Sequence, residues 1–145
     1  MIQRTYKTES ELHVGLVADL LQWLKSTKGY GIRGADLDGY DQPSEVVNKD
    51  GVGDGENKRP DINAFDEREQ VYVRGEAKTG EGDLTSAHTK TQLRLFANLE
   101  NRANGKASLL YVIVPSSKID ELKQVLSDLG LLDKPNVFAV KSGAY

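Results

Sequence analysis

The sequence predicts an α/β domain in which a mixed β-sheet is flanked by helices. The chain has 145 residues, of which 38% are hydrophobic and 28% charged, a composition typical of one globular domain spanning residues 1–145. Apolar segments with helical spacing alternate with short runs rich in β-branched and aromatic residues. Residues 107–114 form a near-continuous apolar run, as buried strands do. We expect the order helix, three strands, helix, strand, helix, strand.

The first half of the chain is predicted to hold one helix and three strands. An apolar stripe at helical spacing indicates a helix over residues 9–28. Thr8 and Glu11 have the spacing of a capping box at its start, and Gly29 suits its end. The three strands are predicted at residues 45–48, 59–66 and 70–78, with a Gly-rich turn after the first.

The second half is predicted to hold two helices and two strands. Residues 85–104 have helical periodicity and stop at Gly105, and Ser117 is a candidate cap for a third helix that reaches about residue 129. The strands are predicted at residues 107–114 and 137–140. No repeat or linker divides the chain.

The composition excludes several kinds of functional site. There are no cysteines, which removes disulfides, thiolate zinc sites and cysteine nucleophiles together. The two histidines, His13 and His88, are too few for a histidine-rich metal site. A metal would therefore be held by carboxylates and backbone oxygens, which favour magnesium, manganese or calcium.

Charge and hydropathy bear on partners and location. Residues 36–56 carry seven acidic side chains and one basic one, a charge of −6, so the remainder carries +3 of the net −3. This balance neither demands nor forbids a phosphate-bearing partner. The sequence has no stretch apolar enough for a membrane helix or a signal core. We therefore expect no membrane partner and a cytoplasmic location.

Two carboxylates and a lysine are predicted to meet at one end of the sheet. Pro60-Asp61 falls on one predicted strand and Glu76-Ala77-Lys78 ends the next, with a tight turn between the strands. Glu76 and Lys78 project from the same face because strand side chains alternate. Asp61 on the paired strand would lie beside them. Two clustered carboxylates raise each other's pKa unless a cation lies between them, and magnesium is the natural cation for such a pair.

This pattern resembles the motif of the PD-(D/E)xK nuclease superfamily, here Pro60-Asp61, fourteen intervening residues and Glu76-Ala77-Lys78. The order of elements resembles that superfamily's restriction-endonuclease-like core over most of the chain. The Gly-Glu-Ala-Lys run and the helix after it are similar to the Holliday-junction-resolvase and VRR-nuclease branches. The resemblance implies Asp61, Glu76 and the Ala77 carbonyl as metal ligands, and Lys78 as the base that positions the water.

The same resemblance implies a DNA nuclease, a phosphodiester hydrolase that uses Mg²⁺, with Mn²⁺ as a substitute. Branched or structured DNA, in repair or recombination, is the substrate expected for the resolvase branch. A resolvase must cut two strands and so needs a symmetric homodimer. The sequence does not decide between endonuclease and exonuclease modes.

Further site residues are predicted on the two helices that flank these strands. Gln92 lies within an apolar stripe, where its amide needs a partner, and the resemblance implies a catalytic glutamine beside the lysine. Glu9 shares the sheet-facing direction of the first helix, and the resemblance implies a metal-binding glutamate there. Glu11 points away and is explained by the capping box, although a later helix start would exchange the two roles. His13 is interpreted as a core-edge histidine, and His88 is a candidate phosphate contact.

Two other interpretations remain open at this stage. The chain could be a non-catalytic DNA-binding or scaffolding domain of the same fold, although such a domain has no physical reason to keep clustered carboxylates. It could also be an unrelated small α/β interaction module, which would be favoured if Asp61 and Glu76 lay far apart. The glycine-rich run at residues 50–56 lacks the spacing of an EF-hand and is interpreted as a flexible turn over the substrate.

Overall fold

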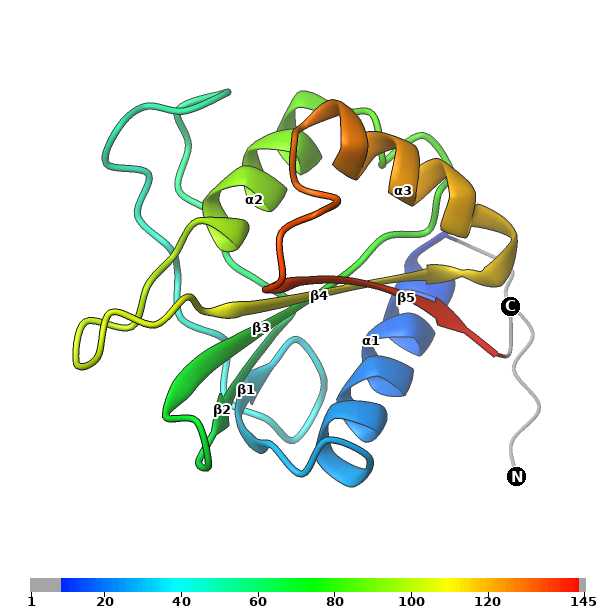
Figure 1. Ribbon diagram of the computed structural model, residues 1–145. Coiled ribbons are helices and arrows are strands. Elements are labelled where there is room, and N and C mark those ends of the chain that lie inside the picture. Colours follow the sequence, from blue (N-terminus) through cyan, green and yellow to red (C-terminus); the bar gives the residue numbers. More distant parts are fainter. Residues whose placement is uncertain (1–8, 144–145) are drawn as a thin grey trace.

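The computed structural model describes residues 9–143, with side chains from residue 11 onward. The chain forms three α-helices, a short 3₁₀ helix and a five-stranded sheet (Figure 1). In chain order the elements are α1 (Glu9–Ser26), β1 (Gly31–Ala35), β2 (Ile62–Asp66), β3 (Val71–Ala77), α2 (Ala87–Ala97), β4 (Leu109–Pro115), η1 (Ser116–Lys118), α3 (Ile119–Asp128) and β5 (Val137–Ser142). The predicted α/β class and the predicted order of helices and strands are confirmed.

The sheet is mixed, and its strands lie in the order β1-β2-β3-β4-β5. β1 pairs antiparallel with β2, and β2 antiparallel with β3. β3, β4 and β5 run parallel to one another, because α2 and α3 provide the crossovers that parallel neighbours need. The tight turn after Asp66 sets the β2–β3 register, in which Ile62 lies opposite Gly75.

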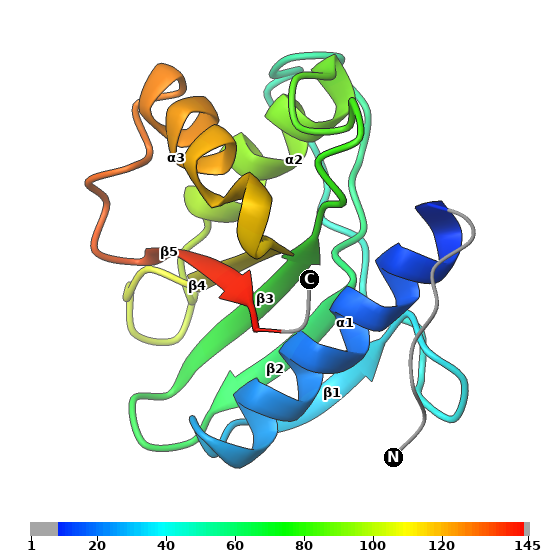
Figure 2. The same ribbon diagram turned by 90° about the vertical axis from the view of Figure 1, so that its right-hand side faces the viewer.

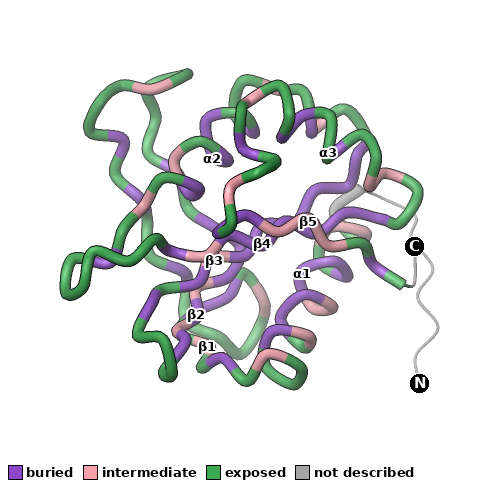
Figure 3. Tube along the Cα trace, in the orientation of Figure 1, coloured by how far each residue is buried: buried purple, intermediate pink, exposed green. Residues whose placement is uncertain are grey.

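Helices cover both faces of the sheet, with α1 on one face and α2 and α3 on the other (Figures 1 and 2). Each face has its own apolar cluster, so the buried segments follow the sheet between the helices (Figure 3). Val73 and Ala77 of β3 pack toward α1, and strand alternation therefore turns Arg74 and Glu76 toward the opposite face. That face of neighbouring β4 carries Leu110 and Val112, their register partners, which pack in the α2–α3 cluster.

A glycine lets α1 approach the sheet closely. A Cβ atom built on Gly75 would lie 2.9 Å from Leu20 Cδ2 and 3.2 Å from Ile62 Cβ, so a larger residue would push α1 outward. This close contact brings the first turns of α1 to the end of β3. The position of α1 therefore determines which of its side chains can reach the candidate site.

Two of the predicted elements were placed wrongly. The first strand is β1 at residues 31–35, whereas residues 45–48 make only an isolated bridge between Val46 and Lys58. In the structure Val46 is buried, but Val47 is exposed. The second helix ends at Ala97 rather than near residue 104, because the backbone N–H of Asn98 closes on Leu95 and the chain then turns.

The predicted helix caps have mixed outcomes. Ser117 does not cap the third helix, which is preceded by the 3₁₀ turn of η1 and has Lys118 at its cap position without a side-chain cap bond. Thr8 and its capping box lie outside the described residues. α1 ends at Ser26, two residues before the predicted end, and Gly29 lies three residues beyond it with a φ of 72°, a conformation that favours glycine. Over residues 9–143 no helix combines the length and apolar character that crossing a membrane requires.

Candidate functional site

The site is built where β2 begins and β3 ends. Because Ile62 pairs with Gly75, Asp61 directly before β2 lies across from Glu76. The backbone N–H of Asp61 donates to the Gly75 carbonyl at 3.1 Å, and the N–H of Ala77 donates to Asp61 Oδ2 at 2.8 Å. These bonds fix the Asp61 carboxylate beside the end of β3, so the predicted juxtaposition of Asp61 and Glu76 is present.

The two carboxyl groups interact strongly. Burial raises the pKa of Glu76 well above its ordinary value, and the charge and hydrogen bond of Asp61 raise this pKa further. Burial also pushes the pKa of Asp61 upward, but hydrogen bonds from His13, Glu76 and the Ala77 N–H outweigh it and leave this pKa below the ordinary value. A proton or a cation between the two carboxyl groups would therefore stabilise the pair.

One buried oxygen of Glu76 has no hydrogen-bond donor beside it among the described residues. Glu76 is only 2% exposed, and its Oε2 atom is fully enclosed without a hydrogen-bond partner in residues 9–143. Buried polar atoms without partners are rare in native proteins. An enclosed carboxylate oxygen next to a second carboxylate is the donor arrangement that a hard divalent cation would complete.

Lys78 lies on the same side of β3 as Glu76, as predicted. Its Nζ donates to Gln92 Oε1 at 2.6 Å and lies 3.7 Å from Glu76 Oε1. Lys78 and Gln92 are both buried. The amide of Gln92 therefore has the partner that the sequence required, and it binds the Lys78 ammonium group more closely than the Glu76 carboxylate does.

The loop between β3 and α2 brings Gln92 to Lys78. The Asp83 carboxylate accepts the backbone N–H groups of Thr79 at 2.7 Å and of Gly80 at 2.8 Å. Gly80 has a φ of 82°, and a Cβ there would meet Lys118 Cγ at 2.4 Å. Ser86 caps α2 by accepting the N–H of Thr89 at 3.1 Å. The start of α2 is thus fixed relative to the end of β3.

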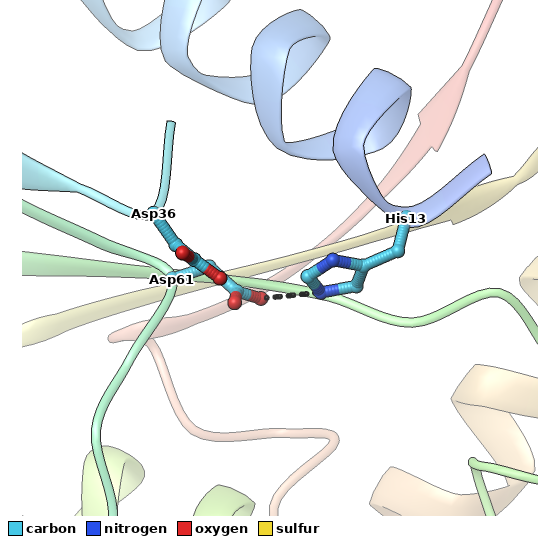
Figure 4. A group of neighbouring side chains, drawn as sticks. All are labelled: His13, Asp36 and Asp61. Carbon is cyan, nitrogen blue, oxygen red and sulfur yellow. Dashed lines mark hydrogen bonds and ion pairs between the residues drawn. The ribbon is translucent and has the colours of Figure 1, made fainter. Parts of the chain in front are cut away.

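His13 belongs to the site, although the sequence indicated only a core-edge position. Its Nε2 lies 3.2 Å from Asp61 Oδ2, and the hydrogen bond to Asp61 raises the pKa of His13. Figure 4 shows the imidazole reaching from the first turns of α1 toward Asp61, with Asp36 beside them just after β1. His13, Asp36 and Asp61 can each offer one ligand atom, all within 4.8 Å of one another.

Neither His13 nor Asp36 had a clear signal in the sequence. The direction of His13 toward the sheet was predicted, and a closer reading of that face would have placed it near Asp61. Asp36 lies in the acidic, glycine-rich stretch, where nothing separates it from its neighbours. It reaches Asp61 because its backbone N–H donates to the Asp61 carbonyl at 2.8 Å.

Two predicted ligands remain predictions. The Glu9 side chain lies outside the described residues, although its backbone begins α1. For Ala77 the described contact is the donation of its N–H to Asp61, and the role of its carbonyl is untested. Glu11, the alternative to Glu9, is exposed on α1.

A second polar cluster lies beside the first, on the loop before β2 and the start of α2. Lys58 is 2% exposed, and its Nζ lies 2.6 Å from Asp54 Oδ2, 2.7 Å from His88 Nδ1 and 3.3 Å from Glu56 Oε1. Burial, followed by the charges of Lys58 and Lys78, lowers the pKa of His88. His88 is therefore neutral near pH 7, with Nδ1 accepting from Lys58.

The glycine-rich run is attached to α2. Asn48 closes the turn by accepting the Val52 N–H at 3.0 Å and donating to the Val52 carbonyl at 2.8 Å. The backbone N–H of Asp54 donates to Thr91 Oγ1 at 3.0 Å. The run is thus fastened to α2 by these contacts, and its position over a substrate stays a prediction.

Comparison of the chain with protein families, with curated proteins and with solved structures finds no match. The chemistry of the site itself is therefore the guide to function. Its donor set of carboxylate oxygens, with an enclosed oxygen that lacks a partner, fits a magnesium or manganese ion.

Proposed function

We propose that this protein is a divalent-cation-dependent deoxyribonuclease with a restriction-endonuclease-like core, a member of the PD-(D/E)xK nuclease class. The observation that carries the proposal is the Asp61–Glu76 pair, with a buried Glu76 oxygen that no described group satisfies. The position of this pair at the end of a mixed sheet, with Lys78 on the same face, supports it. Magnesium is the proposed cofactor, and manganese its substitute.

Each described side chain has a distinct role in this proposal. Asp61 and Glu76 hold the cation, which when bound supplies a water of lowered pKa and neutralises charge on the phosphate. Gln92 holds the Lys78 ammonium, which positions the attacking water and balances negative charge as the bond to the leaving oxygen breaks. His13 fixes one oxygen of Asp61, so that the other oxygen is left for the cation.

The direct test is an incubation of the purified protein with linear, nicked, circular and branched DNA. Magnesium, manganese, calcium and a chelator are compared. Calcium binds the same oxygen ligands as magnesium, but with longer bonds and a more flexible geometry. We expect cleavage with magnesium or manganese and none with the chelator. Glu76→Gln should abolish it, and Glu100→Gln, an exposed glutamate away from the site, should not.

The pattern of products also separates the open alternatives. Cleavage of circular DNA would indicate an endonuclease, and paired cuts in branched DNA would indicate a resolvase that acts as a homodimer. DNA binding without cleavage under any cation would favour the non-catalytic DNA-binding domain. The absence of both binding and cleavage would contradict the proposal and leave the interaction module. A cytoplasmic location remains part of the proposal, and cell fractionation tests it.

A further inference from the structure

The sheet face that carries Glu76 continues past the candidate site. In the β2–β3–β4 register, Asn63 pairs with Arg74 and Arg74 with Leu110, while Glu76 pairs with Val112. Asn63 and Arg74 therefore lie on the same face as Glu76, next to one another across two strands. Arg74 is two residues from Glu76, about 6.6 Å along the strand.

Arg74 and Asn63 both carry enclosed polar atoms without partners. Among the described residues, Nε and Nη1 of Arg74 and Oδ1 of Asn63 have no hydrogen-bond partner. Arg74 is only partly exposed, so these donors are shielded by the fold. A guanidinium binds two acceptor oxygens along the edge that Nη2 shares with Nε or with Nη1, so an acceptor with two oxygens at either edge would satisfy one of these enclosed donors.

Aromatic rings and cations alternate beside Arg74 on the same part of the sheet. The Arg74 guanidinium lies 5.9 Å from the Tyr72 ring, and Tyr72 meets Phe65 edge-on at 5.0 Å. Arg33 of β1 lies over Phe65 at 5.2 Å. Tyr72 is 47% exposed, which leaves a ring available to a ligand. An exposed ring beside arginines suits a nucleic-acid strand, whose bases stack on the ring while its phosphates bind the cations.

We propose that Arg74, which lies opposite Asn63 on the paired strand, binds a backbone phosphate of the DNA strand next to the phosphate held by Asp61 and Glu76. The inference rests on the proposed function. It deepens that function by stating the path of the DNA strand, which would run across β3 and β2. The ligand class is a phosphodiester, because its two non-bridging oxygens match the paired donors of a guanidinium. Tyr72 lies where the neighbouring base would stack.

The test measures DNA binding in calcium, without cleavage, over a range of salt concentrations. The variants are Arg74→Gln and Arg74→Lys, with Arg68→Gln as the matched control because Arg68 is an exposed arginine on the β2–β3 turn. Arg74→Gln should weaken binding about tenfold or more and reduce the slope of log K against log salt by about one. Arg74→Lys should retain the slope but not the full affinity, because lysine lacks the fork. Arg68→Gln should behave as wild type.

Separate outcomes address the inference and the proposed function. A wild-type affinity and salt slope in Arg74→Gln would overturn the inference, whether or not the protein cleaves DNA. A lowered melting temperature with unchanged binding would do the same and make Arg74 structural. If Arg74→Gln does not fold, Tyr72→Ala replaces it, and unchanged binding of single-stranded DNA by that variant overturns the inference. Absence of cleavage by the wild type, with the Arg74 effects intact, would contradict the nuclease and support the subsite.

Discussion

Two acidic clusters lie side by side in this protein and differ in one respect. Around Lys58 the ammonium group touches Asp54, Glu56 and His88, so the cluster carries its own cation. Around Asp61 the only nearby ammonium, among the described residues, is drawn to Gln92 at 2.6 Å and stays 3.7 Å from Glu76. In the first cluster one ammonium group contacts all three ligand groups, whereas the second has a buried carboxylate oxygen without a hydrogen-bond donor.

The comparison shows why a count of acidic side chains is a poor guide to a cation site. Both Asp54-Glu56-His88 and His13-Asp36-Asp61 bring three potential ligand atoms within 4.8 Å. Only the balance of charge and hydrogen bonds separates them. A satisfied cluster has nothing to gain from an ion, whereas an unbalanced buried pair gains both neutralisation and coordination.

The largest effect is expected when the cluster around Asp61 loses the carboxylate of Glu76. Glu76→Gln should reduce cleavage by more than the roughly 100-fold typical of residues that only support a metal ligand. It should also remove the rise in melting temperature that magnesium or manganese gives the wild type, since binding to the folded state stabilises it. Cleavage assays and thermal melts with and without cation measure both effects. If the melting temperature of Glu76→Gln still rises with the cation, Glu76 is not a ligand of the cation.

The same variant tests the cost of the buried carboxyl. The folded-state pKa of Glu76 lies above its ordinary 4.5, so the folded protein holds a proton that the unfolded chain releases. Stability of the wild type should therefore fall as pH rises from about 4.5 toward the raised pKa. In chelator, Glu76→Gln should lack this fall and melt higher than wild type at neutral pH. Equal pH profiles for the two proteins would contradict the assigned burial.

A smaller loss is expected when Lys78 is released from Gln92. Gln92→Ala should reduce cleavage roughly 10- to 100-fold, as loss of a positioning contact does, because the ammonium group is then free to close on Glu76. The melting temperature should fall by a few degrees, at about 3–5 °C per kcal/mol for a domain of this size. Gln92→Glu, which keeps an acceptor for Lys78, is the matched control and should retain more activity. Loss of stability alone would make Gln92 a structural amide.

Removing the ammonium group of Lys58 should make its cluster responsive to a cation, as we propose for the cluster around Asp61. Lys58→Met removes the built-in cation, so Asp54, Glu56 and His88 are left with an uncompensated negative charge. The melting temperature should drop by several degrees in chelator and recover in part with manganese. Placed in the Glu76→Gln background, which has lost the first response, Lys58→Met should restore a cation-dependent shift. If manganese does not change the melting temperature of the double variant, the two clusters differ in more than their charge balance.

The smallest effect concerns the link between His13 and Asp61. The folded-state pKa of His13 is raised above 6.5, so its contribution to stability is fully present below 6.5 and is lost as pH rises through the raised value. His13→Gln should therefore cost most in mildly acidic buffer, about 0.5–1 kcal/mol for a partly exposed pair, and little at alkaline pH. Denaturant unfolding in chelator at several pH values measures this. A pH-independent difference would mean that the contact is packing and not charge.

The sequence alone specified the part of the site that follows from strand geometry. Asp61, Glu76 and Lys78 were predictable because side chains alternate along a strand and a tight turn pairs β2 with β3. Gln92 was predictable because an amide in an apolar helix stripe needs a partner nearby. The predicted second helix continued past Ala97, because the helical periodicity of the sequence continues past the point where tertiary contacts turn the chain.

Only the tertiary structure decided which other groups join these four. His13 reaches Asp61 because Gly75 lets α1 lie close to β3, and Asp36 reaches it through backbone pairing with the Asp61 carbonyl. Lys58 became the centre of its own cluster instead of a surface residue, because the loop before β2 is fastened to α2. These contacts join segments far apart in the chain, and their distances depend on how closely helices pack on the sheet. Local periodicity carries no information on that packing, whereas it fixes the alternation of side chains within each strand.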